Sequence, residues 1–344
     1  MKTAVIIPNY NGLRFMDSCM SALEKQTYRD FCVLIVDNGS TDGSAELLKR
    51  YESENRAEIL LLSENTGFSG AVNAGIRYCC RKDEKPEYIV LLNNDTEAEP
   101  EYLAAMVRAL EEDKAGRIAA VSPLMISLHD RTKIDSAGDG YSLVGWAFQR
   151  GTGRNVGSRK FAGRTEVFSA CAGAAMYRRK ALEEIRREDW IFDPAHFAYL
   201  EDVDVSMRLR IFGYSIVYEP ASRVFHFGSG TSGSKYNSFK VRLAARNNVW
   251  LNVKNLPFLL LLADLPFLLA GVLVKQLFFT VRGFGKDYWN GFREGVAGIP
   301  GIRSHRTVWK PSRTWNYLKI EGRMITDLFS YLQDLFCRHF TDSL

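Results

Sequence analysis

The chain has 344 residues, of which 46% are hydrophobic and 25% are charged, with 27 Gly and 10 Pro. This composition is typical of a globular protein of one or two domains and excludes a disordered, collagen-like or low-complexity chain. The net charge of +5 lies entirely in residues 251–344, which hold 12 Lys/Arg and 7 Asp/Glu. Residues 1–250 carry no net charge, which argues against a main domain that binds nucleic acid, so no nucleic-acid partner is expected.

Residues 1–125 alternate short apolar runs with helical patterns. The runs that predict buried strands are Thr3–Ile7, Phe31–Val36, Glu58–Leu62 and Tyr88–Leu92, and the helical patterns are Arg14–Lys25, Ser44–Glu54 and Gly70–Cys80. Such alternation predicts βαβ units and a parallel sheet, in which ligands bind at the carboxyl ends of the strands. The segments at those ends are polar, so we expect one ligand to span them. The first apolar run is too short for a signal peptide.

Residues 126–175 are broken by many glycines and predict a long functional loop region. Beyond it the pattern predicts helices at Arg178–Arg187, Leu200–Phe212 and Lys240–Val253, and a strand at Ser215–Tyr218. The six cysteines form no C-x-x-C pair, which argues against a zinc ribbon or a disulfide scaffold and fits a reducing cytosol.

The C-terminal part changes in composition at residue 256. Leu256–Val274 is long enough to span a bilayer, but Pro257 and Pro266 interrupt it. Asp264 would lie near the membrane centre at a cost of roughly 2.5–3.5 kcal/mol. We therefore expect a broken hairpin of two short helices, with a true span left open. Basic residues interleaved with aromatics follow, which suits an anionic membrane surface, and an amphipathic helix ends the chain.

Four acidic or histidine positions follow predicted strands or begin helices. Asp37 suits hydrogen bonds to a nucleotide, although taken alone a turn or helix cap is the favoured explanation. Asp95 suits a divalent cation, or a turn. The cluster Glu201-Asp202-Val203-Asp204 has more acids than helix capping requires, so one or more can face a ligand. His226 precedes a Gly-rich segment that permits close approach of a phosphate, and is otherwise structural.

Together these segments resemble the family 2 glycosyltransferases, which have the GT-A fold. The resemblance covers about residues 3–255 and rests on five segments in order: Val5–Gly12, Val36–Ser44, Asn65–Gly75, Leu91–Asp95 and Phe197–Asp204. The rhamnosyltransferase-like branch matches best, through Asn93-Asn94-Asp95, Glu201–Asp204 and His226. Where the family carries its D-x-D motif, this chain has one carboxylate, because Asn93 offers only a neutral oxygen.

The resemblance implies an inverting transfer from a nucleoside diphosphate sugar to a hydroxyl of a lipid-linked or surface glycan. A deoxyhexose donor such as dTDP-L-rhamnose is expected, with a UDP-hexose or UDP-galactofuranose as the alternative. A catalytically dead nucleotide-sugar binding module at the membrane surface is a second alternative. A nucleotidyltransferase would need a phosphate-cradling loop, for which Gly12-Leu13-Arg14 is too thin a match.

The resemblance also implies roles for single residues. Asp202 would be the general base, with Glu201 able to share that role. Asp95 and His226 would bind Mg²⁺ or Mn²⁺. The donor would be held by Pro8, Asn9, Tyr10, Asp37, Asn65, Gly70, Asn73 and Asn94. The acceptor side would include Trp146, Glu201 and Arg246. Core packing is the alternative for Trp146, and a solvated helix face is the alternative for Asn247 and Asn248, which follow Arg246.

The expected organisation is a mostly parallel, Rossmann-like α/β sheet flanked by helices, with a helical tail that associates with a membrane. Residues 1–255 would form the GT-A domain, with a nucleotide-sugar half at 1–125 and an acceptor half at 126–255. Residues 256–344 would form the basic, aromatic tail. Because a lipid-linked acceptor requires it, we expect the enzyme at the cytoplasmic face of the inner or plasma membrane, peripheral or monotopic.

Overall fold

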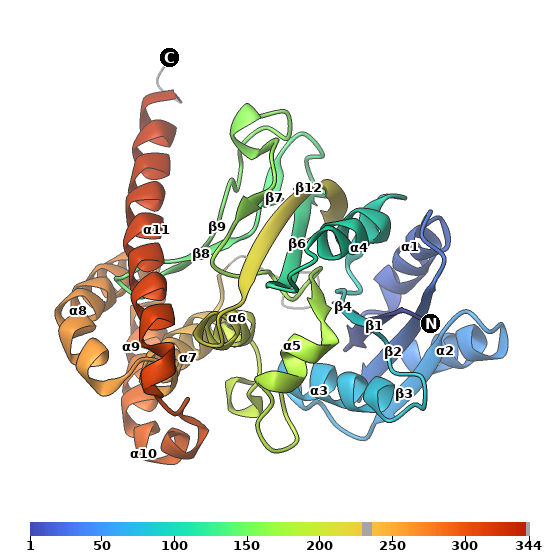
Figure 1. Ribbon diagram of the computed structural model, residues 1–344, viewed down its shortest axis with the longest axis horizontal. Helices are drawn as coiled ribbons and strands as arrows, with labels where there is room; N and C mark the ends of the chain where they lie inside the picture. Colours follow the sequence, from blue (N-terminus) through green and yellow to red (C-terminus); the bar gives the residue numbers. More distant parts are fainter. Residues whose placement is uncertain (229–235, 342–344) are drawn as a thin grey trace.

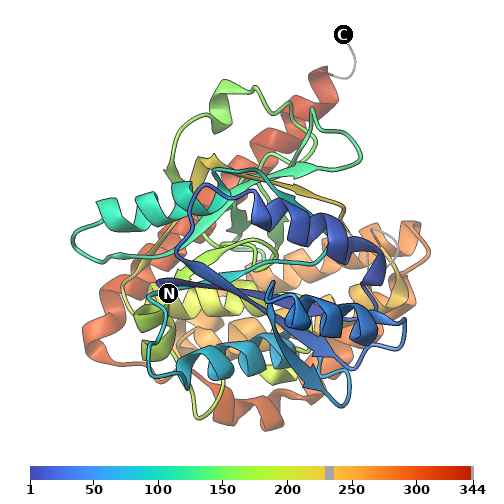
Figure 2. The same ribbon diagram turned by 90° about the vertical axis from the view of Figure 1, so that its right-hand side faces the viewer.

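The computed structural model describes residues 1–228 and 236–341, so most of the Gly-rich segment after His226 lies outside the described residues. Its centre is a ten-stranded sheet with the strand order β10-β12-β6-β11-β4-β1-β2-β3, to which β5 and β7 add at β12 and β6. Figures 1 and 2 show the sheet with helices on both faces. The strands are β1 (Thr3–Asn9), β2 (Phe31–Asn38), β3 (Glu58–Leu62), β4 (Tyr88–Leu91), β5 (Thr96–Ala98), β6 (Ile118–Ser127), β7 (Ile134–Ser136), β10 (Thr165–Glu166), β11 (Met176–Arg178) and β12 (Ser215–His226).

The N-terminal half is parallel, as predicted. Strands β1, β2, β3 and β4 pair in parallel, and the antiparallel strand β11 joins β4 to β6. Side chains of β1 alternate between two cores: Ala4 and Ile6 face one, and Val5 and Ile7 face the other. This double burial explains why the strand is an unbroken apolar run.

Helices cover the two faces of the sheet in separate groups. On one face lie α1 (Leu13–Glu24), α2 (Ser44–Ser53) and α4 (Tyr102–Glu112). On the other face lie α3 (Gly67–Cys80), α5 (Arg179–Glu184) and α6 (Glu201–Ile211). The sheet is therefore enclosed on both sides, and the polar carboxyl ends of its parallel strands are left as the open edge.

The segment 126–175, expected to be a long loop, contains short strands. Besides β7 and β10, β8 (Asp139–Tyr141) and β9 (Ala147–Gln149) form a two-stranded sheet. Backbone hydrogen bonds such as Ala137 N to Arg150 O and Arg150 N to Gly138 O hold this segment together. The prediction failed because strands of three residues are too short to show a period of two.

The tail is helical, with α7 (Ser238–Asn255) leading to α8 (Phe258–Val281), α9 (Gly285–Ala297), α10 (Ile299–Ile302) and α11 (Thr314–Thr341). In Figure 1 these helices gather at the end of the molecule opposite to the N-terminal half. The expected hairpin of two short helices at 256–274 is wrong, because α8 is one helix of 24 residues with Pro266 inside it. Its inner face packs on both sides of the proline, at Leu260 and Gly271, and this packing offsets the missing hydrogen bond.

A third hydrophobic cluster joins the tail to the sheet domain. Val203 and Met207 of α6 and Leu251 of α7 share it with Tyr317 and Met324 of α11. Within the described residues, α8 is the one helix long and apolar enough to cross a membrane.

Candidate active site

A cavity of about 1230 Å³ opens at the carboxyl ends of β1, β2 and β4. Its floor comes from those strand ends, and its opposite wall comes from the start of α6, the β8–β9 sheet and the N-terminus of α7. Nine of the residues predicted for the site line it: Pro8, Asn9, Tyr10, Asn65, Asn94, Asp95, Glu201, Asp202 and His226. The sheet thus brings to one place side chains that are far apart in sequence.

On the donor side, three predicted residues form a chain of hydrogen bonds. Asn9 Nδ2 donates to the Asp37 carboxylate at 2.9 Å, and Asn94 Nδ2 donates to Asn9 Oδ1 at 2.7 Å. Asp37 also accepts from Ser40 N at 3.1 Å. All three side chains of the chain are buried, and Asp37 lies behind Asn9 rather than on the cavity surface. Asp37 is thus placed to orient Asn9.

The loop before α3 closes the donor side. Asn38 Nδ2 donates to Asn65 Oδ1 at 3.0 Å, and Asn65 Oδ1 also accepts from Gly67 N at 2.9 Å. Gly67 has φ +74, and a Cβ there would lie 2.5 Å from the carbonyl oxygen of Phe197. This close approach brings the start of α3 directly under the loop that precedes α6.

Asp95 and His226 face each other, with 3.4 Å between Asp95 Oδ1 and His226 Nε2. The other ring nitrogen, Nδ1, lies 2.8 Å from Asp135 Oδ2. Burial lowers the pKa of His226, but the hydrogen bonds to Asp135 and Asp95 outweigh it and raise that pKa to about 10. A histidine whose second nitrogen contacts a carboxylate is the arrangement found around metal-ligating histidines.

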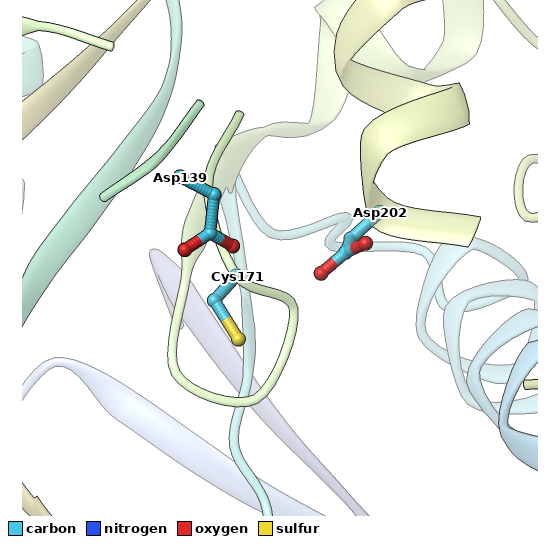
Figure 3. A group of neighbouring side chains, drawn as sticks. All are labelled: Asp139, Cys171 and Asp202. Carbon is cyan, nitrogen blue, oxygen red and sulfur yellow. The ribbon is translucent and has the colours of Figure 1, made fainter. Parts of the chain in front are cut away.

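Opposite this pair, Asp202 of α6 points toward Asp139 of β8 and Cys171 (Figure 3). One ligand atom from each lies within 4.8 Å of the other two. The Asp202 carboxylate accepts from Val203 N at 2.8 Å and from Ala172 N at 3.4 Å. Burial raises the pKa of Asp202, and burial together with the Asp202 charge raises the pKa of Asp139 well above its usual range.

Glu201 lies beside Asp202 on the cavity wall. Its Oε2 is buried and has no hydrogen-bond partner. Burial first, and the Asp202 charge second, raise its pKa well above the usual range.

The loop before α6 has an unusual backbone. Phe197, Tyr199 and Leu200 have φ of 63°, 70° and 66°, which is strained for residues other than glycine. Asn247 Nδ2 donates to the carbonyls of His196, Ala198 and Tyr199 at 2.8–2.9 Å and holds this conformation. Asn247 is fully buried, so the solvated helix face considered for it is wrong.

Four further predicted residues support the cavity from outside. Arg246 donates to the carbonyls of Ala195 and His196 and does not reach the cavity surface. Asn73 binds the backbone of residues 191 and 192, with Nδ2 donating to Phe192 O at 2.6 Å. Gly70 packs against Thr66. Trp146 donates from Nε1 to Gly271 O at 3.2 Å, which favours its packing alternative.

The cavity is also lined by residues that no sequence motif indicated, among them Asp139, Phe148, Cys171 and Lys240. Asp135 and Asp139 could not be placed from the sequence, because each lies in a strand of three residues, which is too short to show the alternation of apolar and polar residues typical of a strand.

Behind α6, a buried charge network holds this helix against α7. Lys254 Nζ contacts Asp193 and lies 3.0 Å from Asp204 Oδ1, and Arg208 Nε lies 3.0 Å from Asp204 Oδ2. These four side chains are at most 1% exposed. Although burial opposes ionisation, Lys254 holds the pKa values of Asp193 and Asp204 below their ordinary value.

Comparison with known proteins identifies the family. A family model described as "Glycosyl transferase family 2" matches residues 4–186. The chain belongs to glycosyl transferase family 2. The match covers the donor side of the cavity and the β8–β9 sheet, and it confirms the resemblance predicted from the sequence motifs.

Curated relatives of this family 2 glycosyltransferase match over different lengths. GlyA of Streptococcus pneumoniae is 27% identical over 33% of this chain and 16% of its own length, and YibD of Escherichia coli is 38% identical over 33% and 31%. The chain thus aligns with less than a third of either relative. The N-acetylglucosaminyl-diphospho-decaprenol L-rhamnosyltransferase of Mycobacterium tuberculosis is 25% identical over 72% of this chain and 85% of that protein. This likeness supports the rhamnosyltransferase-like branch.

Solved structures confirm the GT-A type α/β fold. S. aureus TarS 1–349 in complex with UDP-GlcNAc matches with a TM-score of 0.56 and 16% identity over 97% of this chain and 92% of that chain. GalNAc-T7 with UDP, GalNAc and Mn²⁺ matches with a TM-score of 0.56 and 15% identity, over 74% of this chain and 48% of that chain.

Proposed function

We propose that this enzyme transfers a sugar, with inversion, from a nucleoside diphosphate sugar to a hydroxyl of a lipid-linked glycan. The observation that carries the proposal is that Asp202, Asp95 and His226 line one cavity together with the predicted donor residues. The relatives support it further, since the M. tuberculosis protein is named as acting on a diphospho-decaprenol acceptor. An L-rhamnosyl donor is the specific form that this likeness favours.

The residues opposite Asp202 fit a divalent cation. Asp95 would supply a carboxylate oxygen, and His226, whose raised pKa keeps the free ring protonated, would supply Nε2 after releasing that proton to solvent. Asp135 holds the ring through Nδ1. This donor set suits Mg²⁺ or Mn²⁺ with the donor diphosphate completing the shell. When bound, such an ion stabilises negative charge on the departing diphosphate. Lys240, which lines the cavity and lies near Asp95, adds positive charge to the same side.

The chain's own residues then account for the transfer. The acceptor hydroxyl lies against Asp202, whose carboxylate takes its proton as the oxygen attacks the anomeric carbon. The bond between that carbon and the diphosphate oxygen breaks, and the diphosphate leaves on the opposite face, toward Asp95. Backbone N–H groups of Val203 and Ala172 hold the Asp202 carboxylate in place. One base and one displacement give inversion.

The tail supports a membrane-bound acceptor. The outer face of α8 exposes a continuous set of large apolar side chains: Phe258, Leu259, Leu262, Leu265, Phe267, Leu269, Leu273, Val274, Leu277, Phe278 and Val281. Both charged residues of α8, Asp264 and Lys275, lie outside this set, and α8 is followed by Arg282 and Lys286. An apolar face with flanking cations suits a helix lying in the interface of an anionic bilayer at the cytoplasmic leaflet.

The test is sugar transfer from a panel of nucleoside diphosphate sugars with Mn²⁺. Asp202→Asn should lower the transfer rate by about 10²–10⁴-fold, the range for losing a general base, while donor binding by thermal shift stays unchanged. Glu201→Gln is the matched control at the neighbouring position and should lose much less. Full activity in Asp202→Asn would remove the base assignment, and a larger loss in Glu201→Gln would transfer it to Glu201.

A further inference from the structure

Aromatic side chains gather where the start of α7 borders the cavity. Phe197, Tyr199 and Phe239 all line it. The ring of Phe239 meets the other two edge to face, with 6.3 Å to the ring centroid of Phe197 and 6.4 Å to that of Tyr199. Phe239 is nevertheless 53% exposed. The three rings therefore present apolar surface to the cavity instead of filling a core.

The backbone fixes two of these rings in an uncommon conformation. Phe197 and Tyr199 have φ of 63° and 70°, and the Asn247 side chain holds this loop through three backbone carbonyls. Strained backbone of this kind persists only where the surrounding structure over-determines it, and it clusters at ligand sites. The position of the two rings is therefore built into the fold.

A second aromatic group connects the start of α7 with α8. Tyr236 precedes Phe239 by three residues, and its ring lies 6.0 Å from that of Phe278 and 5.7 Å from that of Phe279. Phe278 is 37% exposed and belongs to the apolar outer face of α8. Arg282 lies over its ring, 3.6 Å from the centroid. Aromatic residues thus follow one another from the outer face of α8 to the cavity.

We propose that Phe278, Tyr236, Phe239, Tyr199 and Phe197 form an aromatic path that binds the isoprenoid chain of the acceptor lipid. This inference rests on the proposed function and names the surface that recognises its acceptor. One end of the path belongs to the face of α8 that suits a bilayer, and the other end lines the cavity that holds the proposed general base. A chain that follows the path therefore brings its head group to the site of transfer. Rigid rings bury a large apolar area, which offsets the entropy lost when a flexible chain is ordered.

The experiment uses farnesyl phosphate with a benzophenone at the end of its chain, added to the full-length protein on phosphatidylglycerol vesicles. Irradiation should attach this probe to the tryptic peptides 236–240 and 276–282, and unlabelled farnesyl phosphate should compete. Phe239→Ala should lower labelling of these peptides at least about fivefold, because a large apolar contact is lost. Phe239→Leu, which stays apolar, should retain most of it. Phe329→Ala, at an exposed position of α11, is the matched control and should label as wild type does.

Four outcomes would overturn the inference. These are no labelling, labelling spread over the whole tail as from a chain dissolved in the bilayer, a fall in Phe239→Ala no larger than in Phe329→Ala, or equal labelling by dodecyl phosphate with the same benzophenone. Because Phe239 is more than half exposed, Phe239→Ala should melt within about 1 °C of wild type, so lost labelling does not reflect unfolding.

A thermal shift with nucleoside diphosphate sugars is measured in parallel and separates this inference from the proposed function. If the sugars give no shift while the path is labelled, the proposed function fails. If they give a shift and the path is not labelled, the aromatic path fails.

Discussion

Replacing Lys254 with methionine should destabilise the protein, because two buried carboxylates depend on its ammonium. Asp193 and Asp204 are both fully buried, and the second buried cation, Arg208, contacts Asp204. Without Lys254, Arg208 remains as the cation at Asp204, and Asp193 keeps only the His305 ring, whose Nδ1 lies 2.9 Å from Asp193 Oδ2. The buried pair then lacks the lysine charge that balances its second carboxylate. Breaking a buried pair from one side costs about 3–5 kcal/mol.

This loss converts to a change in melting temperature. Unfolding entropy is about 2.1 cal/mol/K per residue, which for 344 residues gives roughly 0.7 kcal/mol/K. Lys254→Met should therefore lower the melting temperature by roughly 4–7 °C in a calorimetric scan. The exposed Lys180 gives the matched control, and Lys180→Met should change it by less than about 1 °C.

A double variant tests the cause. In Asp193→Asn/Lys254→Met, Arg208 balances the single remaining acid, Asp204, and the asparagine can still accept from Ala195 N as Asp193 does. This variant should recover at least half of the lost stability. If it is no more stable than Lys254→Met, or if Lys254→Met itself melts within 1 °C of wild type, charge compensation is not what Lys254 provides.

Two further predictions concern the contacts that hold α8 against the rest of the protein. Burial, and then Asp264, raise the pKa of Glu321 to about 8, so the folded state keeps a proton that the unfolded chain releases above its ordinary value of 4.5. Stability should therefore fall as pH rises from about 4.5 to 8. The melting temperature of Glu321→Gln should exceed that of the wild type, and the difference should grow as the pH rises from about 4.5 to 8. A difference that does not depend on pH would contradict this prediction. Gly271→Ala should lower the free energy of unfolding in urea by about 1–3 kcal/mol, because the added Cβ would meet the carbonyl oxygen of Val144. Gly301→Ala is the control, since a Cβ there has open space and should leave the free energy unchanged. Equal effects of the two substitutions would refute the close contact.

Sequence patterns predicted the donor half closely because its strands are buried on both faces. A strand such as β1 must then be apolar throughout, and the polar residues at its end mark where burial stops. Motif order also led to Asp95, Asp202 and His226, which the fold brings to one cavity.

The same patterns could not predict the acceptor wall or α8. Asp139 and Asp135 reach the site from strands held by backbone hydrogen bonds across Gly-rich turns, which leave no periodic trace. Pro266 predicted a break because proline removes a backbone hydrogen bond from a helix. The helix α8 nevertheless continues through it, since tertiary contacts at Leu260 and Gly271 hold both sides of the proline. Asn73 and Arg246 were predicted for the donor and acceptor sides, and their side chains bind the backbone around the cavity rather than line its surface.

The shared interior of α6 and α11 restricts how such an enzyme can be rearranged. Val203 and Met207, on the helix that carries Asp202, are shielded from water by Tyr317 and Met324 near the end of the chain. If the tail were replaced by that of a relative, the new tail would need apolar residues that pack against Val203 and Met207. Otherwise this face of α6 would be exposed to solvent. A change in the tail is therefore also a change in the packing of the helix that bears Asp202.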